Sequence, residues 1–100
     1  MGAHPFTDYI ATLDVEAAYW KAVDMAISEY GRDPYNGTIS TTDGYFVLDA
    51  PPATLTEASE TFLDRLDDPR IERRGDCAAW AIRDEAGTRT GWFFFGLAAS

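Results

Sequence analysis

The sequence predicts an α+β fold in which a four-stranded antiparallel sheet carries two helices on one face. Two segments place apolar residues at helical spacing, and two others have the composition and turn residues of β-hairpins. Hydrophobic residues make up 46% of the chain, which is enough for one buried core and argues against disorder. The predicted element order is α-β-β-α-β-β, and residues 1–100 are expected to form a single domain.

The first element expected is a helix that ends at Gly31. Thr12 is its candidate N-cap residue, and Gly31 can adopt the positive φ that commonly ends a helix. Residues 1–12 have little periodicity, so we expect this segment to be partly mobile. The apolar residues that recur at helical spacing are Val15, Tyr19, Ala22, Val23, Ala26, Ile27 and Tyr30.

Two β-hairpins are expected, one before and one after a second helix. In the first hairpin, residues 38–42 and 45–49 favour strands, and the Asp-Gly pair between them suits a tight turn. In the second, residues 77–83 and 89–97 flank a polar turn that contains a glycine. A sheet of four antiparallel strands, with both helices on one face, is the simplest way to combine these elements.

The second helix is predicted by a capping box and a terminating proline. Thr54 and Glu57 have the T-x-x-E spacing, in which each side chain accepts a hydrogen bond from the backbone N–H of the other residue. Pro69 ends the pattern, because the residue before a proline is disfavoured in a helix. The apolar residues expected to face the core are Leu55, Ala58, Phe62 and Leu66.

The same helix is predicted to carry five carboxylates on one face, which we call the acidic stripe: Glu57, Glu60, Asp64, Asp67 and Asp68. At 100° per residue, these side chains fall within about 100° of one another, opposite the apolar residues. Carboxylates at this spacing repel one another, and the last two lie at the negative end of the helix dipole. An ordinary solvated face explains the stripe, and so does a surface that meets a positively charged partner.

The net charge limits the classes of partner. The chain has 17 acidic and 8 basic residues, and its formal charge is −9. This balance repels phosphate backbones, so we expect basic protein partners and no direct nucleic-acid binding.

We find no basic-then-apolar leader or long apolar run, so we expect a cytoplasmic location and no membrane association. The single cysteine, Cys77, excludes an internal disulfide and fits a reducing compartment.

The last predicted strand contains the aromatic run GWFFFG. Alternation sends Trp92 and Phe94 to one face of the sheet, and Trp80 on the neighbouring strand alternates similarly. We call these three residues the aromatic face. If both helices cover the opposite face, the aromatic face is partly bare, which is typical of an interface or a ligand groove. Cover by other segments, a homodimer interface and a small-molecule platform all remain open.

Few residues support catalysis. His4 is the only histidine, and Cys77 has no evident activating base. The sequence has no C-x-x-C, no paired histidines and no glycine-rich phosphate loop. We therefore expect no enzyme activity, no catalytic residues, no metal and no cofactor. A carboxylate buried in a cleft with a strongly raised pKa would reopen the question of a general acid.

Three pieces of the sequence carry a resemblance: DPYNGTISTTDGYFVLD, RIERRGDCAAWAI and GWFFFGLAAS. They resemble small acidic proteins of bacteriophages and other mobile elements, a class that includes anti-CRISPR and anti-restriction inhibitors. Some of those inhibitors are similar to DNA in their charge arrangement. With the acidic stripe, the resemblance implies an inhibitor that binds a basic, nucleic-acid-handling host protein. The alternative is a homo-oligomeric module that binds or sequesters a small ligand on the aromatic face.

Overall fold

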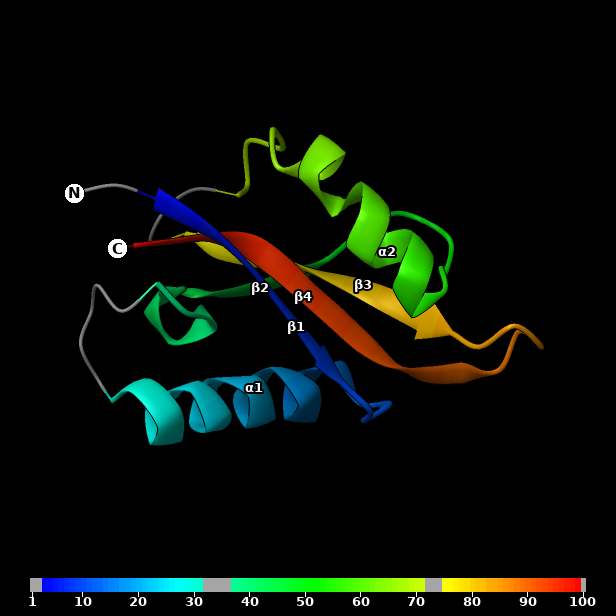
Figure 1. Cartoon of the computed structure of the whole chain (residues 1–100), viewed down its shortest axis with the longest axis horizontal. Coiled ribbons are helices and arrows are strands. Elements are labelled where there is room, and N and C mark those ends of the chain that lie inside the picture. The colour runs from blue at the N-terminus through cyan, green and yellow to red at the C-terminus, as the bar shows by residue number, and fades with distance from the viewer. Residues whose placement is uncertain (1–2, 32–36, 72–74, 100) are drawn as a thin grey trace.

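The computed structural model describes residues 3–31, 37–71 and 75–99 (Figure 1). Within these residues the chain forms two helices and one four-stranded sheet, so the predicted α+β class is confirmed. Two short 3₁₀ turns accompany them. The elements in chain order are β1 (Ala3–Ile10), α1 (Val15–Tyr30), η1 (Ile39–Thr41), β2 (Gly44–Val47), α2 (Leu55–Thr61), η2 (Phe62–Arg65), β3 (Asp76–Arg83) and β4 (Arg89–Ala99).

The sheet has the strand order β1-β4-β3-β2 (Figure 1). β4 pairs antiparallel with both β1 and β3, whereas β2 runs parallel to β3. The sheet is therefore mixed, and the prediction of a fully antiparallel sheet is wrong. Parallel neighbours need a crossover connection, and the segment that contains α2 supplies it between β2 and β3.

β1 occupies most of residues 1–12, the segment that the sequence indicates as partly mobile. Ala3–Ile10 instead pairs along its whole length with β4. Phe6 and Ile10 are both buried in the core. Asp8 lies between them on the same face and breaks the apolar alternation that would reveal a strand. The expectation of mobility is therefore wrong for Ala3–Ile10.

Residues 38–42 form the turn η1 and not the first strand of a hairpin. The Thr41 hydroxyl donates a hydrogen bond to the Thr38 carbonyl oxygen at 2.9 Å. Such local hydroxyl-to-backbone bonds offer the chain an alternative to strand pairing. Ile39 is fully buried, which fixes the turn against the core. The predicted first hairpin is therefore wrong, and only its second half survives as a strand, β2.

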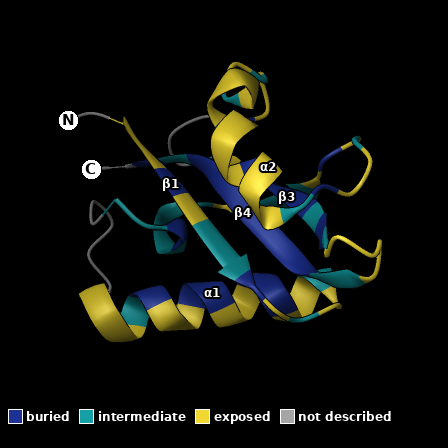
Figure 2. Ribbon diagram, turned by 45° about the vertical axis from the view of Figure 1, so that its right-hand side comes forward, coloured by how far each residue is buried: buried dark blue, intermediate teal, exposed yellow. Residues whose placement is uncertain are grey.

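The two helices cover opposite faces of the sheet, so the fold has three layers instead of the expected two (Figures 1 and 2). β4 shows why both faces can be covered. Phe94 belongs to the core beneath α1, whereas Phe93 and Phe95 belong to the core beneath α2, and all three are buried. A strand buried on both faces needs a continuous apolar run, which β4 has. Figure 2 shows β4 buried between the helices.

The second hairpin is confirmed, with β3 and β4 antiparallel to each other. Its turn is held by Asp84, whose Oδ1 accepts a hydrogen bond from the backbone N–H of Thr88 at 2.9 Å. Gly87 in this turn has a φ of 90°, a conformation that favours glycine.

Gly91 lies where β4 passes the end of β1. A Cβ atom on Gly91 would lie 2.1 Å from the carbonyl oxygen of Ile10. No side chain can occupy that space without moving the backbone, so the pairing of β1 with β4 depends on this glycine.

Candidate functional site

The acidic stripe does not lie on one continuous α-helix. α2 begins with the predicted capping box, in which the Thr54 backbone N–H donates to Glu57 Oε1 at 3.0 Å. The α-helix ends at Thr61, however, and the chain continues as the 3₁₀ turn η2. A 3₁₀ turn advances by about 120° per residue instead of 100°. The prediction that all five carboxylates share one helical face is therefore wrong.

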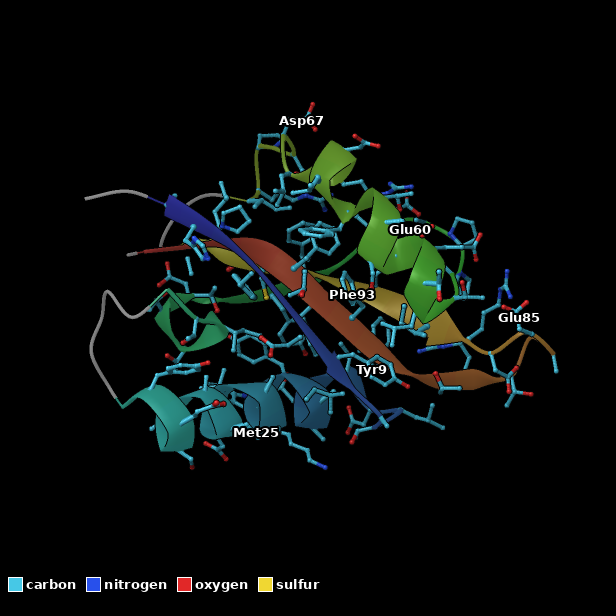
Figure 3. All side chains as sticks on the ribbon, viewed as in Figure 1. Tyr9, Met25, Glu60, Asp67, Glu85 and Phe93 are labelled. Atoms are coloured by element: carbon cyan, nitrogen blue, oxygen red, sulfur yellow. The ribbon has the colours of Figure 1, made fainter. Side chains whose placement is uncertain are left out.

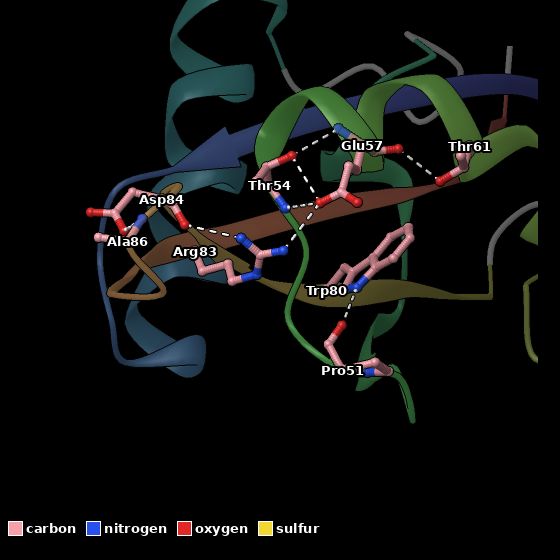
Figure 4. A network of polar contacts seen from close by, with 8 residues as sticks. All are labelled: Pro51, Thr54, Glu57, Thr61, Trp80, Arg83, Asp84 and Ala86. Atoms are coloured by element: carbon pink, nitrogen blue, oxygen red, sulfur yellow. Dashed lines mark hydrogen bonds and ion pairs between the residues drawn. The ribbon is translucent and has the colours of Figure 1, made fainter.

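Two of the five carboxylates have partners within the fold. Glu57 Oε1 caps α2 and also lies 3.5 Å from Nη2 of Arg83 (Figure 4). The hydrogen bond from the Thr54 backbone is the main reason why the pKa of Glu57 is lowered. Asp68 accepts bonds from Nη2 and Nε of Arg70 at 2.8 and 3.1 Å, and Arg70 lowers the pKa of Asp68 to about 2. Both carboxylates therefore contribute to local structure.

The other three carboxylates are exposed and uncompensated. The side-chain carboxylates of Glu60, Asp64 and Asp67 make no hydrogen bond or ion pair with any residue in the described part of the chain. Figure 3 shows Asp67 just beyond the end of η2, well separated from Glu60. The three residues therefore form an acidic edge along this segment instead of a compact cluster. We refer to them as the free carboxylates.

Glu60 and Asp64 line one side of a groove of about 1060 Å³ between the α2–η2 segment and the β3–β4 hairpin. We call it the charged groove. Its other lining residues include three cations, Arg65, Arg83 and Arg89. The groove therefore presents charges of both signs, and Asp67 does not line it.

Trp80 forms part of the wall of the charged groove, although only 5% of its surface is exposed. Its indole Nε1 donates a hydrogen bond to the carbonyl oxygen of Pro51 at 3.1 Å (Figure 4). The guanidinium carbon of Arg65 lies 4.7 Å from the centroid of the Trp80 ring, close enough for a cation–π contact. These contacts fix Trp80 as a structural residue of the groove wall.

The aromatic face does not exist as a bare surface. Trp92 and Phe94 lie in the core beneath α1, whereas Trp80 lies in the core on the opposite face of the sheet. All three are buried, and the Trp92 indole is hydrogen-bonded to the Leu13 carbonyl oxygen at 2.8 Å. The prediction of a bare face shared by these residues is wrong, because the helices cover both faces. Trp80, Trp92 and Phe94 therefore share no exposed surface on which one ligand could bind.

Part of the exposed apolar surface lies on α1 and not on the predicted aromatic face. Trp20 is 53% exposed and Met25 is 56% exposed, and Tyr30, which the helical spacing assigns to the core, is also exposed. The available signal was that Trp20 and Met25 fall outside the predicted core arc. The residues of this α1 outer face, which line a shallow hollow, are Ala17, Trp20, Lys21, Asp24, Met25, Ser28 and Glu29.

Trp20 is held in place although it is exposed. Its indole Nε1 donates a hydrogen bond to Glu16 Oε2 at 2.8 Å, and the other oxygen of Glu16 accepts from the Tyr45 hydroxyl. The Tyr45 bond is the largest cause of the lowered pKa of Glu16, and it raises the pKa of Tyr45 to about 12. Tyr19 adds an edge-on ring contact to Trp20 at 5.2 Å. This network ties the indole to β2 as well as to α1.

A second feature adjoins the α1 outer face: a cleft of about 280 Å³ between β1 and α1. We call it the β1–α1 cleft. Asp8 and Glu29 approach it from the two elements, and His4 and Tyr30 also line it. Burial, and then the negative charge of Glu29, raise the pKa of Asp8 to about 6. No cation in the described part of the chain forms an ion pair with either carboxylate.

No protein family, curated protein or solved structure matches the chain. No helix among the described residues is long and apolar enough to cross a membrane.

Among the described residues, Asp8 is a carboxylic acid with a raised pKa, which is the property expected of a general acid. No hydrogen bond joins it to His4, Glu29 or Tyr30, so no reacting partner is positioned beside it. Burial raises the pKa of the Cys77 thiol to about 12, which leaves it un-ionised near neutral pH. No three His, Cys, Asp or Glu side chains in the described ranges are grouped to hold a metal ion.

Proposed function

We propose that this protein is a non-enzymatic inhibitor that binds a basic, nucleic-acid-handling protein through the free carboxylates. The observation that carries the proposal is the division of the acidic stripe. Glu57 and Asp68 have partners within the fold, whereas Glu60, Asp64 and Asp67 are exposed and have none in the described part of the chain. Such charges add repulsion to the α2–η2 segment and are best explained by compensation from a partner.

The proposed mechanism is competition for sites that accept phosphate groups. Arginine and lysine side chains that hold a nucleic-acid backbone also form charge-assisted hydrogen bonds with carboxylates. The net charge of −9 would attract such a surface from a distance and speed association, and added salt would weaken it. The resemblance to small acidic inhibitors of mobile elements supports the same class of partner, with an anti-defence role.

The test is a charge reversal of Glu60 and Asp64. We expect the immobilised protein to capture a basic partner from a lysate of its host, and nucleic acid or rising salt to release that partner. The variant Glu60→Lys/Asp64→Lys should lose at least about tenfold in affinity, since each reversed contact becomes repulsive. Circular dichroism should show that the variant remains folded, because both side chains are exposed.

A matched control reverses two exposed carboxylates elsewhere. Asp43→Lys/Glu85→Lys changes the net charge by the same amount, at sites outside the α2–η2 segment. This control should keep most of its affinity. If both double variants lose affinity equally, only net charge matters, and if neither does, the free carboxylates are an ordinary solvated surface.

A further inference from the structure

The α1 outer face lies on the opposite side of the sheet from the free carboxylates and plays no part in the function proposed above. Trp20 and Met25 are more than half exposed on it, and they line one shallow hollow. Figure 3 shows Met25 on α1, on the side of the molecule away from Glu60. Small side chains, Ala17 and Ser28, line the same hollow. Tryptophan and methionine are enriched at protein–protein interfaces, and tryptophan is among the residues that most often dominate binding energy.

The fixed position of Trp20 is a second observation that favours docking. An exposed tryptophan free to rotate would lose side-chain entropy on binding. Here the hydrogen bond to Glu16 and the ring contact with Tyr19 already restrict the indole. Glu16 is itself bonded to Tyr45, so the restriction comes from outside the helix as well. Trp20 can therefore enter a complex with little further ordering.

The charges around this face identify the kind of occupant. Asp24 and Glu29 line the hollow with a single cation, Lys21. Glu29 also borders the β1–α1 cleft, where it and Asp8 have no cationic partner among the described residues. A second copy of this chain would bring acidic residues against acidic residues, which disfavours a dimer through α1. A segment with lysine or arginine beside its apolar side chains would complement both the hollow and the cleft.

We propose that the α1 outer face and the β1–α1 cleft together form a docking surface for an amphipathic, basic protein segment. Apolar side chains of that segment would cover Trp20 and Met25. A lysine or arginine of the same segment would enter the cleft between Asp8 and Glu29 and supply the cation that they lack. The protein would then have two interaction surfaces, one on each side of its sheet.

The test uses a synthetic amphipathic helix of leucine and lysine as the probe, and the same helix with glutamate in place of lysine as its counterpart. Trp80 and Trp92 are 5% and 9% exposed, so a blue shift of tryptophan emission on binding reports mainly on Trp20. We expect the basic peptide to cause this shift and to perturb backbone amide NMR signals of α1 and β1. The acidic peptide should do neither.

Variants separate the two parts of the surface. Trp20→Ala should weaken binding of the basic peptide by about tenfold. The affinity of this variant is measured by NMR, because the variant lacks the fluorescence of Trp20. Asp8→Asn/Glu29→Gln should weaken binding several-fold at low salt and much less at high salt, as expected for a screened charge contact. Asp43→Lys/Glu85→Lys reverses two exposed carboxylates that line neither the hollow nor the cleft, and it should leave binding within about twofold, so a loss in the first two variants is not an effect of net charge.

Three results would overturn the proposal. The first is no binding of the basic peptide, or equally tight binding of the acidic one. The second is unchanged affinity in Trp20→Ala. The third is a protein that sediments as a dimer which Trp20→Ala dissociates, because the occupant of the face would then be a second copy of the chain.

Discussion

Replacing Asp8 by asparagine should make the protein more stable at neutral pH. Asp8 is a partly buried residue of β1, on the side that faces α1. Glu29 faces it from α1, Cys77 lies nearby on β3, and His4 lies on β1 as well. Burial is the main cause, and the charge of Glu29 the second cause, of a pKa raised from 3.8 to about 6. Asparagine keeps the shape of the side chain and removes the charge that this environment disfavours.

The sign and size of the effect follow from that pKa. The folded state holds the Asp8 proton more tightly than the unfolded chain does. Asp8 therefore contributes stability that is fully present below pH 3.8 and is lost as the pH rises through about 6. The difference of about two pH units corresponds to about 3 kcal/mol, and solvent screening at a partly exposed carboxyl reduces it to about 1–2 kcal/mol. Asp8→Asn should recover that amount at pH 8 and nothing below pH 4.

The assay is urea unfolding of the wild type and the variant at pH 4, 6 and 8, followed by circular dichroism. The free energy of unfolding should rise in the variant only at the two higher pH values. Glu29→Gln should give a smaller gain in the same direction, because Glu29 is the second cause of the raised pKa. Asp24→Asn, on the exposed face of α1, should change stability by less than about 0.5 kcal/mol. A variant no more stable than the wild type at pH 8, or a gain that does not depend on pH, would refute the reasoning.

Two further predictions concern the fold. Gly91→Ala should lower the free energy of unfolding by about 1–3 kcal/mol or more, because its Cβ would collide with the Ile10 carbonyl oxygen. Gly44→Ala is the matched control, since its Cβ would meet only an ordinary contact at 3.5 Å. Thr54→Ala should cost about 1 kcal/mol by removing the capping box, and Thr54→Ser should not. Urea unfolding checks all four variants, and equal stability within either pair would contradict the prediction.

The parts of the fold that the sequence predicts correctly are those set by local chemistry. The capping box at Thr54 and the turn at Asp84 lie within a few residues of the groups they bind. The placement of β2 is different, because its parallel pairing with β3 depends on a distant partner. β1 was not predicted for a similar reason. Only Phe6 and Ile10 favour a strand within it, and its pairing depends on β4, which is distant in sequence. The apolar run of β4 is typical of a strand buried on both faces, but placing both helices on one face leaves the other face bare.

In the candidate site as well, local interactions could be predicted from the sequence and distant ones could not. The structural role of Glu57 follows from its spacing to Thr54, but the pairing of Asp68 with Arg70 depends on how the chain turns after η2. Helical angles cannot be extended past Thr61, because the α-helix ends there. Asp8 could not be recognised at all from the sequence, since its raised pKa depends on α1 packing across β1.

The strand order has a consequence for how the chain folds. β1 begins at Ala3, and β4, the strand it pairs with, ends at Ala99. The paired strands at this edge of the sheet therefore come from opposite ends of the described chain. A contact between such distant residues closes a large loop, and proteins dominated by such contacts fold slowly for their size. β1 must therefore remain without its partner strand until β4 has been synthesised.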